Sequence, residues 1–246
     1  MGKRVYSTTE VDVGGTRIKV RQVLLQGKDI VPQQVAAATV SARMWFDLAM
    51  PRYLSHAGVA RITPEFRFCF HCDPEPQYVN TVMSVLGTIR SALNRPFAVK
   101  VLDMNDGTLG YVSRRYSGCV QQVMGVQQFD KDDDLIHSRG EMHLARSVLK
   151  TGDVAGVTLI HEAGHKFANL RDHGWRGYFD SQFNGYEDNT LPAHECLYNA
   201  DSYAVFVYLL ANPELARRRI PSYIRAQNRA AAAADDNLEG LHNLFG

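Results

Sequence analysis

Several features that define common protein classes are missing from this sequence of 246 residues. It contains no apolar run of about 18 residues, so it predicts no transmembrane helix. The first residues are not followed by a hydrophobic segment, so no general secretory signal is predicted. Lys and Arg number 27 against 26 Asp and Glu, and this balance argues against a nucleic-acid or membrane-surface partner. We therefore expect a protein that works in the cytoplasm, is exported by a specialised secretion system, or lacks its leader sequence here.

Cysteine is also scarce, with four residues at Cys69, Cys72, Cys119 and Cys196. Cys69 and Cys72 have the spacing of a zinc knuckle or a redox pair, but no second such pair would complete four metal ligands. Buried thiols in a strand, or a disulfide that involves Cys119, are therefore favoured over a second metal site.

Two regions are expected from the hydrophobic patterning. Residues 9–24 alternate around a Gly-Gly pair, which predicts a β-hairpin, and a short helix is expected near 40–50, ended by Pro51. We interpret residues 1–60 as an N-terminal extension of unknown role that packs on a main domain of residues 61–246.

The main domain is predicted to be α+β, with a small sheet before a central helix and further helices after it. The expected strands cover residues 65–72, 97–102, 109–114, 120–129 and 141–149. The expected helices cover residues 76–96, 153–170 and 192–210, with one or two surface helices after them.

The central helix carries the motif His161-Glu162-Ala163-Gly164-His165. On an α-helix the two histidines lie one turn apart on one face, where neutral imidazoles can bind one Zn²⁺, and Glu162 can reach a metal-bound water. A core helix without a metal has little reason to hold these groups, because each buried polar group without a partner costs about 1–3 kcal/mol. The motif therefore predicts zinc-dependent hydrolysis in preference to a satisfied pair of core histidines.

A catalytic zinc usually has three protein ligands, so one more residue is needed. The metzincin pattern fails, because Ala168 and Arg171 stand where it requires Gly and His. On spacing, the candidates are Asp172 or its neighbour His173 in the loop after the helix, and Glu195, thirty residues beyond His165.

At this point the sequence resembles the aspzincins, the family of deuterolysins and lysine-specific metalloendopeptidases. Residues 158–165 match the family pattern Thr-Leu-Ile-His-Glu-x-x-His, and residues 199–206 match Asn-Ala-Asp-Ser-Tyr-x-x-Phe. The resemblance covers roughly residues 65–210. It implies a zincin-like fold in which one Zn²⁺ is bound by His161, His165 and Asp172.

The loop between these two motifs departs from the family pattern. It lacks Gly-Thr, its aspartate follows the second histidine slightly sooner, and Trp175 occupies the place of a tyrosine that hydrogen-bonds the oxyanion in the family. Tyr178 or the indole of Trp175 is expected to take that role. The resemblance also implies that Asp201 lines a substrate pocket, whereas Ala204 at the second acidic position of that pocket argues against strict lysine specificity.

The sequence therefore predicts a zinc metalloendopeptidase acting on a peptide or protein substrate. Glu162 is expected to take a proton from the water and to give it to the leaving amine. The alternatives are a non-catalytic binding module with a zincin fold, and a peptidase toxin delivered into another cell. The sequence predicts no oligomeric state.

Overall fold

The computed structural model describes residues 6–23, 30–54, 56–104, 109–112, 121–123, 126–128, 141–180, 185–186 and 191–221. The strands are β1 (Tyr6–Val13), β2 (Thr16–Val23), β3 (Phe97–Leu102), β4 (Gly110–Tyr111), β5 (Gln121–Val123), β6 (Val126–Gln128) and β7 (Met142–Ala145). The α-helices are α1 (Val31–Leu54), α2 (His56–Phe70), α3 (Pro76–Leu93), α5 (Asp153–Ala168), α6 (Ala193–Cys196), α7 (Ala200–Ala211) and α8 (Pro213–Arg219). Short 3₁₀ turns are η2 (Val148–Lys150) and η3 (Gly174–Gly177).

Five strands form one mixed sheet in the order β1-β2-β3-β7-β4. The inner strands β2, β3 and β7 run parallel, and the edge strands β1 and β4 run antiparallel to their neighbours. β1 and β2 form the predicted hairpin. Its two-residue turn needs Gly14 and Gly15, because both have positive φ angles, of 59° and 80°. The alternation in β2 buries Ile18 and Val20 beneath the sheet.

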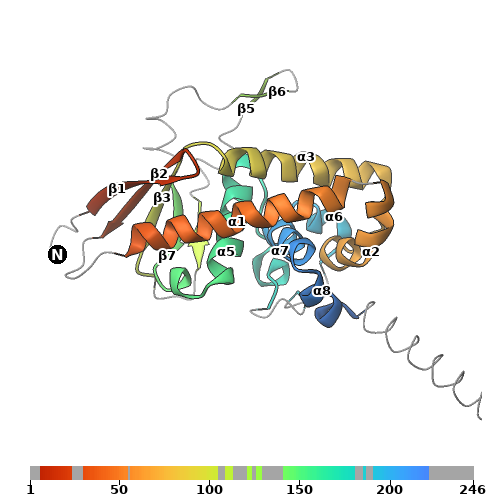
Figure 1. The fold of residues 1–246 in the computed structure, drawn as a ribbon. Coiled ribbons are helices and arrows are strands. Elements are labelled where there is room, and N and C mark those ends of the chain that lie inside the picture. Colours follow the sequence, from red (N-terminus) through yellow and green to blue (C-terminus); the bar gives the residue numbers. More distant parts are fainter. Residues whose placement is uncertain are drawn as a thin grey trace, which may run out of the picture.

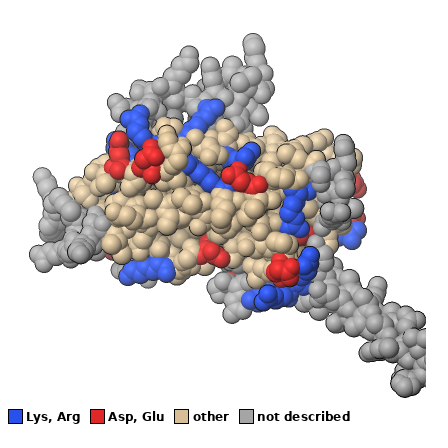
Figure 2. All heavy atoms as spheres, viewed as in Figure 1, with Lys and Arg blue, Asp and Glu red and all other residues tan. Residues whose placement is uncertain are grey.

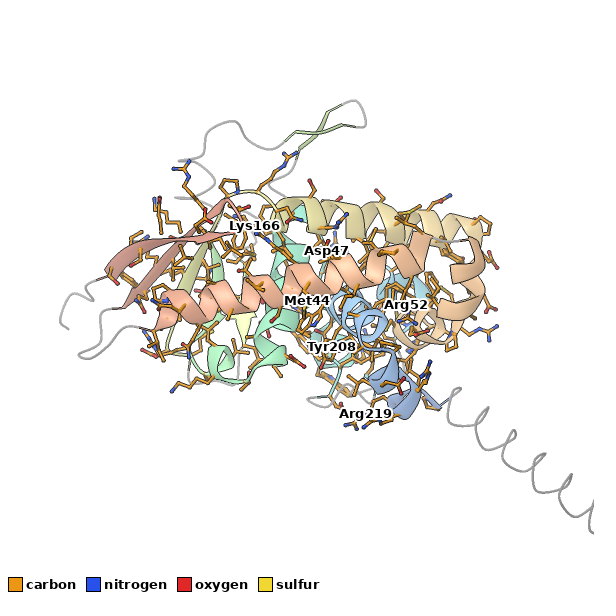
Figure 3. All side chains as sticks on the ribbon, in the orientation of Figure 1. Met44, Asp47, Arg52, Lys166, Tyr208 and Arg219 are labelled. Atoms are coloured by element: carbon orange, nitrogen blue, oxygen red, sulfur yellow. The ribbon has the colours of Figure 1, made fainter. Side chains whose placement is uncertain are left out.

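The helices cover this sheet and continue the core beyond it (Figure 1). α1 packs on β1 and β2, α5 packs on β7 and β4, and both helices contact each other and α7. Trp45 of α1 meets Tyr208 of α7 edge to face, with ring centroids 4.8 Å apart, where Figure 3 places Tyr208 beside the middle of α1. The predicted α+β fold, with a small sheet packed on the helix that carries the histidine motif, is confirmed.

α5 is the most enclosed helix. Every residue from 155 to 167 is buried, because α1, α3, α7 and the sheet surround it. A helix enclosed in this way needs apolar residues on all its faces, as its sequence has. The polar residues buried within it therefore need a specific reason to be there.

One expected element near the N-terminus is wrong, and another is longer than expected. Residues 65–72 alternate in sequence, but residues 65–70 belong to α2, because the buried positions Ile62, Phe66, Cys69 and Phe70 recur with the helical period. Residues 71–72 follow the helix and are not in a strand. The helix expected near 40–50 is the longer α1, which continues through Pro51 to Leu54.

Other boundaries also differ. The helix expected over 192–210 is divided into α6 and α7 at residues 197–199, and the strand expected over 141–149 ends at Ala145. Of residues 109–114, only β4 is a strand within the described part, and residues 120–129 contain the antiparallel pair β5 and β6. α8 is one of the expected C-terminal helices, and the residues after 221 lie outside the described part.

Of the four cysteines, the three that the structure describes are free thiols outside strands. Cys69 lies in the last turn of α2 and Cys196 ends α6, and both are buried, whereas Cys72 follows α2 and is half-buried. The predicted disulfide of Cys119 lies outside the described residues.

The first sixty residues share the sheet and the core with the rest of the chain. β2 lies between β1 and β3, and α1 places Phe46 and Ala49 in the common core. The described part of this region is thus not a separate layer added to a complete domain, because the sheet would lose two of its five strands without it.

In Figure 2 the middle of the α1 side is largely free of charged residues, which gather above it, to its right and along its lower edge. Val40, Met44 and Leu48 are exposed there along one face of α1. Among the described helices, none combines the length and apolar composition needed to cross a bilayer.

The contact between α1 and α5 depends on a glycine, which gives a test of the packing. A Cβ atom at Gly156 would lie 2.6 Å from the indole of Trp45. We expect Gly156→Ala to lower the free energy of unfolding by about 1–3 kcal/mol, the usual effect of overpacking. Gly87→Ala in α3 is the control, because nothing lies within 4 Å of its added Cβ, and we expect it to raise that free energy by about 0.5–1 kcal/mol. Urea unfolding of both variants measures the difference, and equal effects would contradict this packing.

Candidate metal centre

Three predicted ligands meet at one place, at the end of α5. The Nε2 atoms of His161 and His165 lie 2.9 Å apart, as expected for residues one helical turn apart. Asp172 Oδ1 lies 3.2 Å from the first of these nitrogens and 3.1 Å from the second. Within the described part of the chain, these three residues form the group whose ligand atoms can share a metal ion.

A left-handed residue brings Asp172 back to the helix. Asn169 has φ 54° and ψ 33°, and it ends α5 one turn after His165. The following amide, that of Leu170, donates to the carbonyl of Gly164, so the chain reverses around the helix end. This reversal explains how a ligand only seven positions after His165 reaches the same site.

The Nδ1 atom of each histidine forms a hydrogen bond on the side of the ring that faces away from the shared site. His165 Nδ1 lies 2.8 Å from the carbonyl oxygen of Leu170, and His161 Nδ1 lies 3.0 Å from Asp201 Oδ1. Both partners accept hydrogen bonds, so each imidazole carries a proton on Nδ1. When the rings are neutral, both Nε2 lone pairs are then directed at the shared site.

The charges at the site favour a cation. Burial alone would lower the pKa of His161, but its hydrogen bonds to Asp172 and Asp201 outweigh this effect and raise that pKa well above its usual value. Burial would likewise raise the pKa of Asp172, but hydrogen bonds from both histidines hold it well below its usual range. The site therefore attracts a proton strongly when no metal is present, and a metal ion must displace that proton.

Glu162 lies beside this group and is almost fully buried, with 1% of its surface exposed. Its Oε2 has no hydrogen-bond partner among the described residues. Burial raises the pKa of its carboxyl group to about 7, although the nearby histidines oppose the shift. A buried carboxylate oxygen without a hydrogen-bond partner lowers the stability of the fold. Such an oxygen is expected where a protein binds a water molecule or a ligand.

Gly110 is a site residue that the sequence analysis missed. Its backbone lies so close to Glu162 that a Cβ atom added there would be 2.5 Å from Oε1. β4 therefore passes directly over the carboxylate. A glycine within a predicted strand was the available signal, because such a glycine often marks a close backbone approach.

The two aromatic candidates for the oxyanion role lie differently. The ring of Tyr178 is parallel to that of His161 within 20°, with centroids 6.0 Å apart, and its hydroxyl donates a hydrogen bond to Asp172. Burial, together with the negative charges of Asp172 and Asp201, raises the pKa of Tyr178 well above its usual value, so the phenol keeps its proton. Trp175 lies on η3 and is 66% exposed. Tyr178 is the aromatic residue that contacts the ligand group.

The other two candidates for third ligand pair with each other. Glu195 Oε2 lies 3.3 Å from His173 Nδ1 and 3.5 Å from Arg176 Nη2. The structure does not bring Glu195 or His173 into the ligand group found among the described residues.

Asp201, which the resemblance placed in a substrate pocket, lies behind His161. Besides its contact with that ring, its Oδ2 accepts a hydrogen bond of 2.7 Å from the backbone amide of Phe179. Ala204, one turn later on α7, is fully buried in the core.

The donor set fits Zn²⁺. Two imidazole nitrogens and one carboxylate oxygen, with a fourth position left for water, are a usual catalytic zinc set. Bonds of about 2.0–2.1 Å in a tetrahedron give ligand-to-ligand distances of about 3.3 Å. The observed spacings of 2.9, 3.1 and 3.2 Å are close to that value, and Glu162 interacts electrostatically with all three ligand residues.

No protein-family model and no curated protein sequence matches this chain. Among solved structures, the chain is similar to a zinc peptidase from Grifola frondosa, with 18% sequence identity and a TM-score of 0.49. The match covers 74% of this chain and 94% of the other. At this identity and TM-score, the likeness does not by itself identify an activity.

Zinc affinity tests the ligand set. Asp172→Ala removes one of three ligands, so we expect zinc affinity to fall by more than about 100-fold, the upper range for residues that only orient a ligand. Glu195→Gln is the matched control, and we expect it to leave affinity close to that of the unaltered protein. Competition with a chromophoric chelator measures both. A loss in the second variant with none in the first would move the third ligand to Glu195.

Proposed function

We propose that this chain is a zinc-dependent metalloendopeptidase of the aspzincin type. The observation that carries the proposal is the position of Glu162: a buried carboxylate with a partnerless oxygen, next to two imidazoles and an aspartate that fit Zn²⁺. The two sequence motifs that resemble the aspzincins lie on the elements that form this site, α5 and the start of α7.

The residues of the chain have separate roles. His161, His165 and Asp172 would hold Zn²⁺, which when bound polarises a scissile carbonyl group and lowers the pKa of a bound water molecule. Glu162 accepts the proton of the attacking water on its carboxylate and then donates it to the leaving amine. Burial raises the pKa of Glu162 above that of an exposed glutamate, to about 7 without a metal ion, and this shift favours its holding a proton for the leaving amine.

Tyr178 would supply the remaining hydrogen bond if its one hydroxyl proton, donated to Asp172 in the metal-free protein, turned to the substrate. Its hydroxyl keeps its proton, lies beside His161 and Asp172, and is 39% exposed, so it can be reached by a substrate. We assign to it the donor role toward the oxyanion that a tyrosine three residues after the ligand aspartate has in the family. Trp175, which occupies that place in this sequence, is a surface residue.

The substrate is a peptide in an extended conformation. β4 ends the order of strands in the described sheet and pairs there only with β7, so its other edge has backbone groups that a peptide strand can pair with. The close approach of Gly110 to Glu162 puts one face of β4 against the side chain of the proposed general base. A substrate bound along β4 would therefore pass its backbone across the site.

Glu162→Gln separates binding from chemistry. The amide keeps the shape of the side chain but cannot take a proton, so we expect kcat/KM on casein or a quenched peptide to fall by at least about 10²–10⁴-fold. Zinc content should remain equal to that of the unaltered protein. Chelator treatment should abolish the original activity, and added zinc should restore it. A zinc-loaded protein that cleaves no peptide would favour the non-catalytic binding module.

Tyr178→Phe tests the oxyanion donor. Loss of one such donor typically lowers kcat by about 10²–10³-fold, and we expect a fall in this range at saturating zinc, with KM little changed. Trp175→Phe is the control and should retain most of the activity, because the indole is exposed. The reverse pattern, a large loss only in Trp175→Phe, would transfer the role to the indole.

A further inference from the structure

Asp201 is held on both of its carboxylate oxygens. Oδ1 lies 3.0 Å from His161 Nδ1, and Oδ2 accepts a hydrogen bond from the backbone amide of Phe179 at 2.7 Å. The side chain is 14% exposed. One carboxylate thus joins the ligand helix α5 to the segment that follows Tyr178.

This arrangement suits a partly buried residue that supports the ligands better than a pocket for a charged substrate side chain. A carboxylate that recognises a lysine side chain is directed at the substrate, whereas both oxygens of Asp201 are directed at donors of the protein itself, His161 Nδ1 and the amide of Phe179. Ala204, at the place of the second acidic residue of such a pocket, is fully buried. The two positions together offer no exposed acidic pocket.

Residues next to Asp201 hold the same loop at other points. The amide of Arg171 donates to the carbonyl of Tyr198, and the amide of Ala200 donates to the carbonyl of Arg171, at 2.8 and 3.0 Å. Asn199 Nδ2 donates to the carbonyl of Gly177 at 2.7 Å. The segment 198–201 therefore fixes the chain immediately before Asp172 and again after it.

We propose that Asp201 is a positioning residue for the metal centre and not a substrate-recognition residue. Its carboxylate fixes the proton of His161 on Nδ1 and the orientation of the ring, so that Nε2 is directed at the metal. Through Phe179 it also anchors the loop that carries Asp172 and Tyr178. This inference rests on the proposed function in taking the ligand group as a zinc site.

The decisive experiment measures zinc affinity, not only hydrolysis. We expect Asp201→Asn to weaken zinc binding by about 10–100-fold, as is typical when the partner of a ligand histidine is removed. The visible absorption spectrum of the Co²⁺-substituted protein should change as well, because it reports ligand geometry. Asp153→Asn is the control: this carboxylate also accepts a hydrogen bond, from the Tyr208 hydroxyl at 2.6 Å, but contacts no ligand, so affinity should not change.

The alternative role predicts a different result. If Asp201 recognised substrate, Asp201→Asn would keep the original zinc affinity and Co²⁺ spectrum but would raise KM selectively for peptides with lysine or arginine beside the cleaved bond. That outcome would overturn the proposal. Thermal unfolding of the metal-free variants shows whether Asp201→Asn still folds.

A measurement on the unaltered protein covers the case in which the variant does not fold. In the zinc-loaded protein with ¹⁵N-labelled histidine, we expect the His161 signal of a ring protonated on Nδ1 and bound to metal through Nε2. Metal bound through Nδ1 would overturn the proposal. Failure of the unaltered protein to bind zinc would instead refute the zinc site itself, whereas tight binding in both proteins would refute only the role of Asp201.

Discussion

His161 lies between two carboxylates, and the arrangement of the site depends on these contacts. Asp172 approaches its Nε2 and Asp201 approaches its Nδ1, at 3.2 and 3.0 Å. One carboxylate comes from the loop after α5 and the other from α7, so a single buried ring connects three parts of the chain. The turn at Asn169 and the backbone hydrogen bonds of Arg171 to Tyr198 and Ala200 maintain this arrangement, because they hold the loop after α5 against the start of α7.

Elements with a strong local signal were predictable from the sequence. The Gly-Gly turn defined the hairpin, the three- and four-residue spacing defined α3, and the apolar sequence around the motif defined α5. α2 was not predictable in this way, because alternating Phe66, Phe68 and Phe70 resemble a strand, and only tertiary burial shows that Phe66 and Phe70 share a helical face. The place of α1 in the core depends on contacts with α5 and α7, which no local pattern contains.

In the candidate site, too, some features follow from local sequence and others depend on tertiary contacts. The spacing of His161 and His165 follows from helical geometry, and the family resemblance singled out Asp172, which the structure places with both histidines. The orientation of Asp201 could not be predicted, because it depends on how α7 is turned against α5. The approach of Gly110 to Glu162 is likewise a relation between β4 and α5, which lie about fifty residues apart in the sequence.

The burial of α5 makes it resemble any other core helix. The same burial changes the pKa of Glu162, on which the proton transfer proposed for this residue depends. An exposed glutamate titrates near 4.3, too low to return a proton readily at neutral pH. Burial under β4 raises the pKa of Glu162 to about 7, and it leaves one oxygen without a protein partner. A fold selected for stability alone would fill this position with an apolar side chain, since the partnerless oxygen costs about 1–3 kcal/mol. The retained carboxylate, next to a set of donors that fits Zn²⁺, therefore agrees better with the proton transfer proposed for it than with a role in packing.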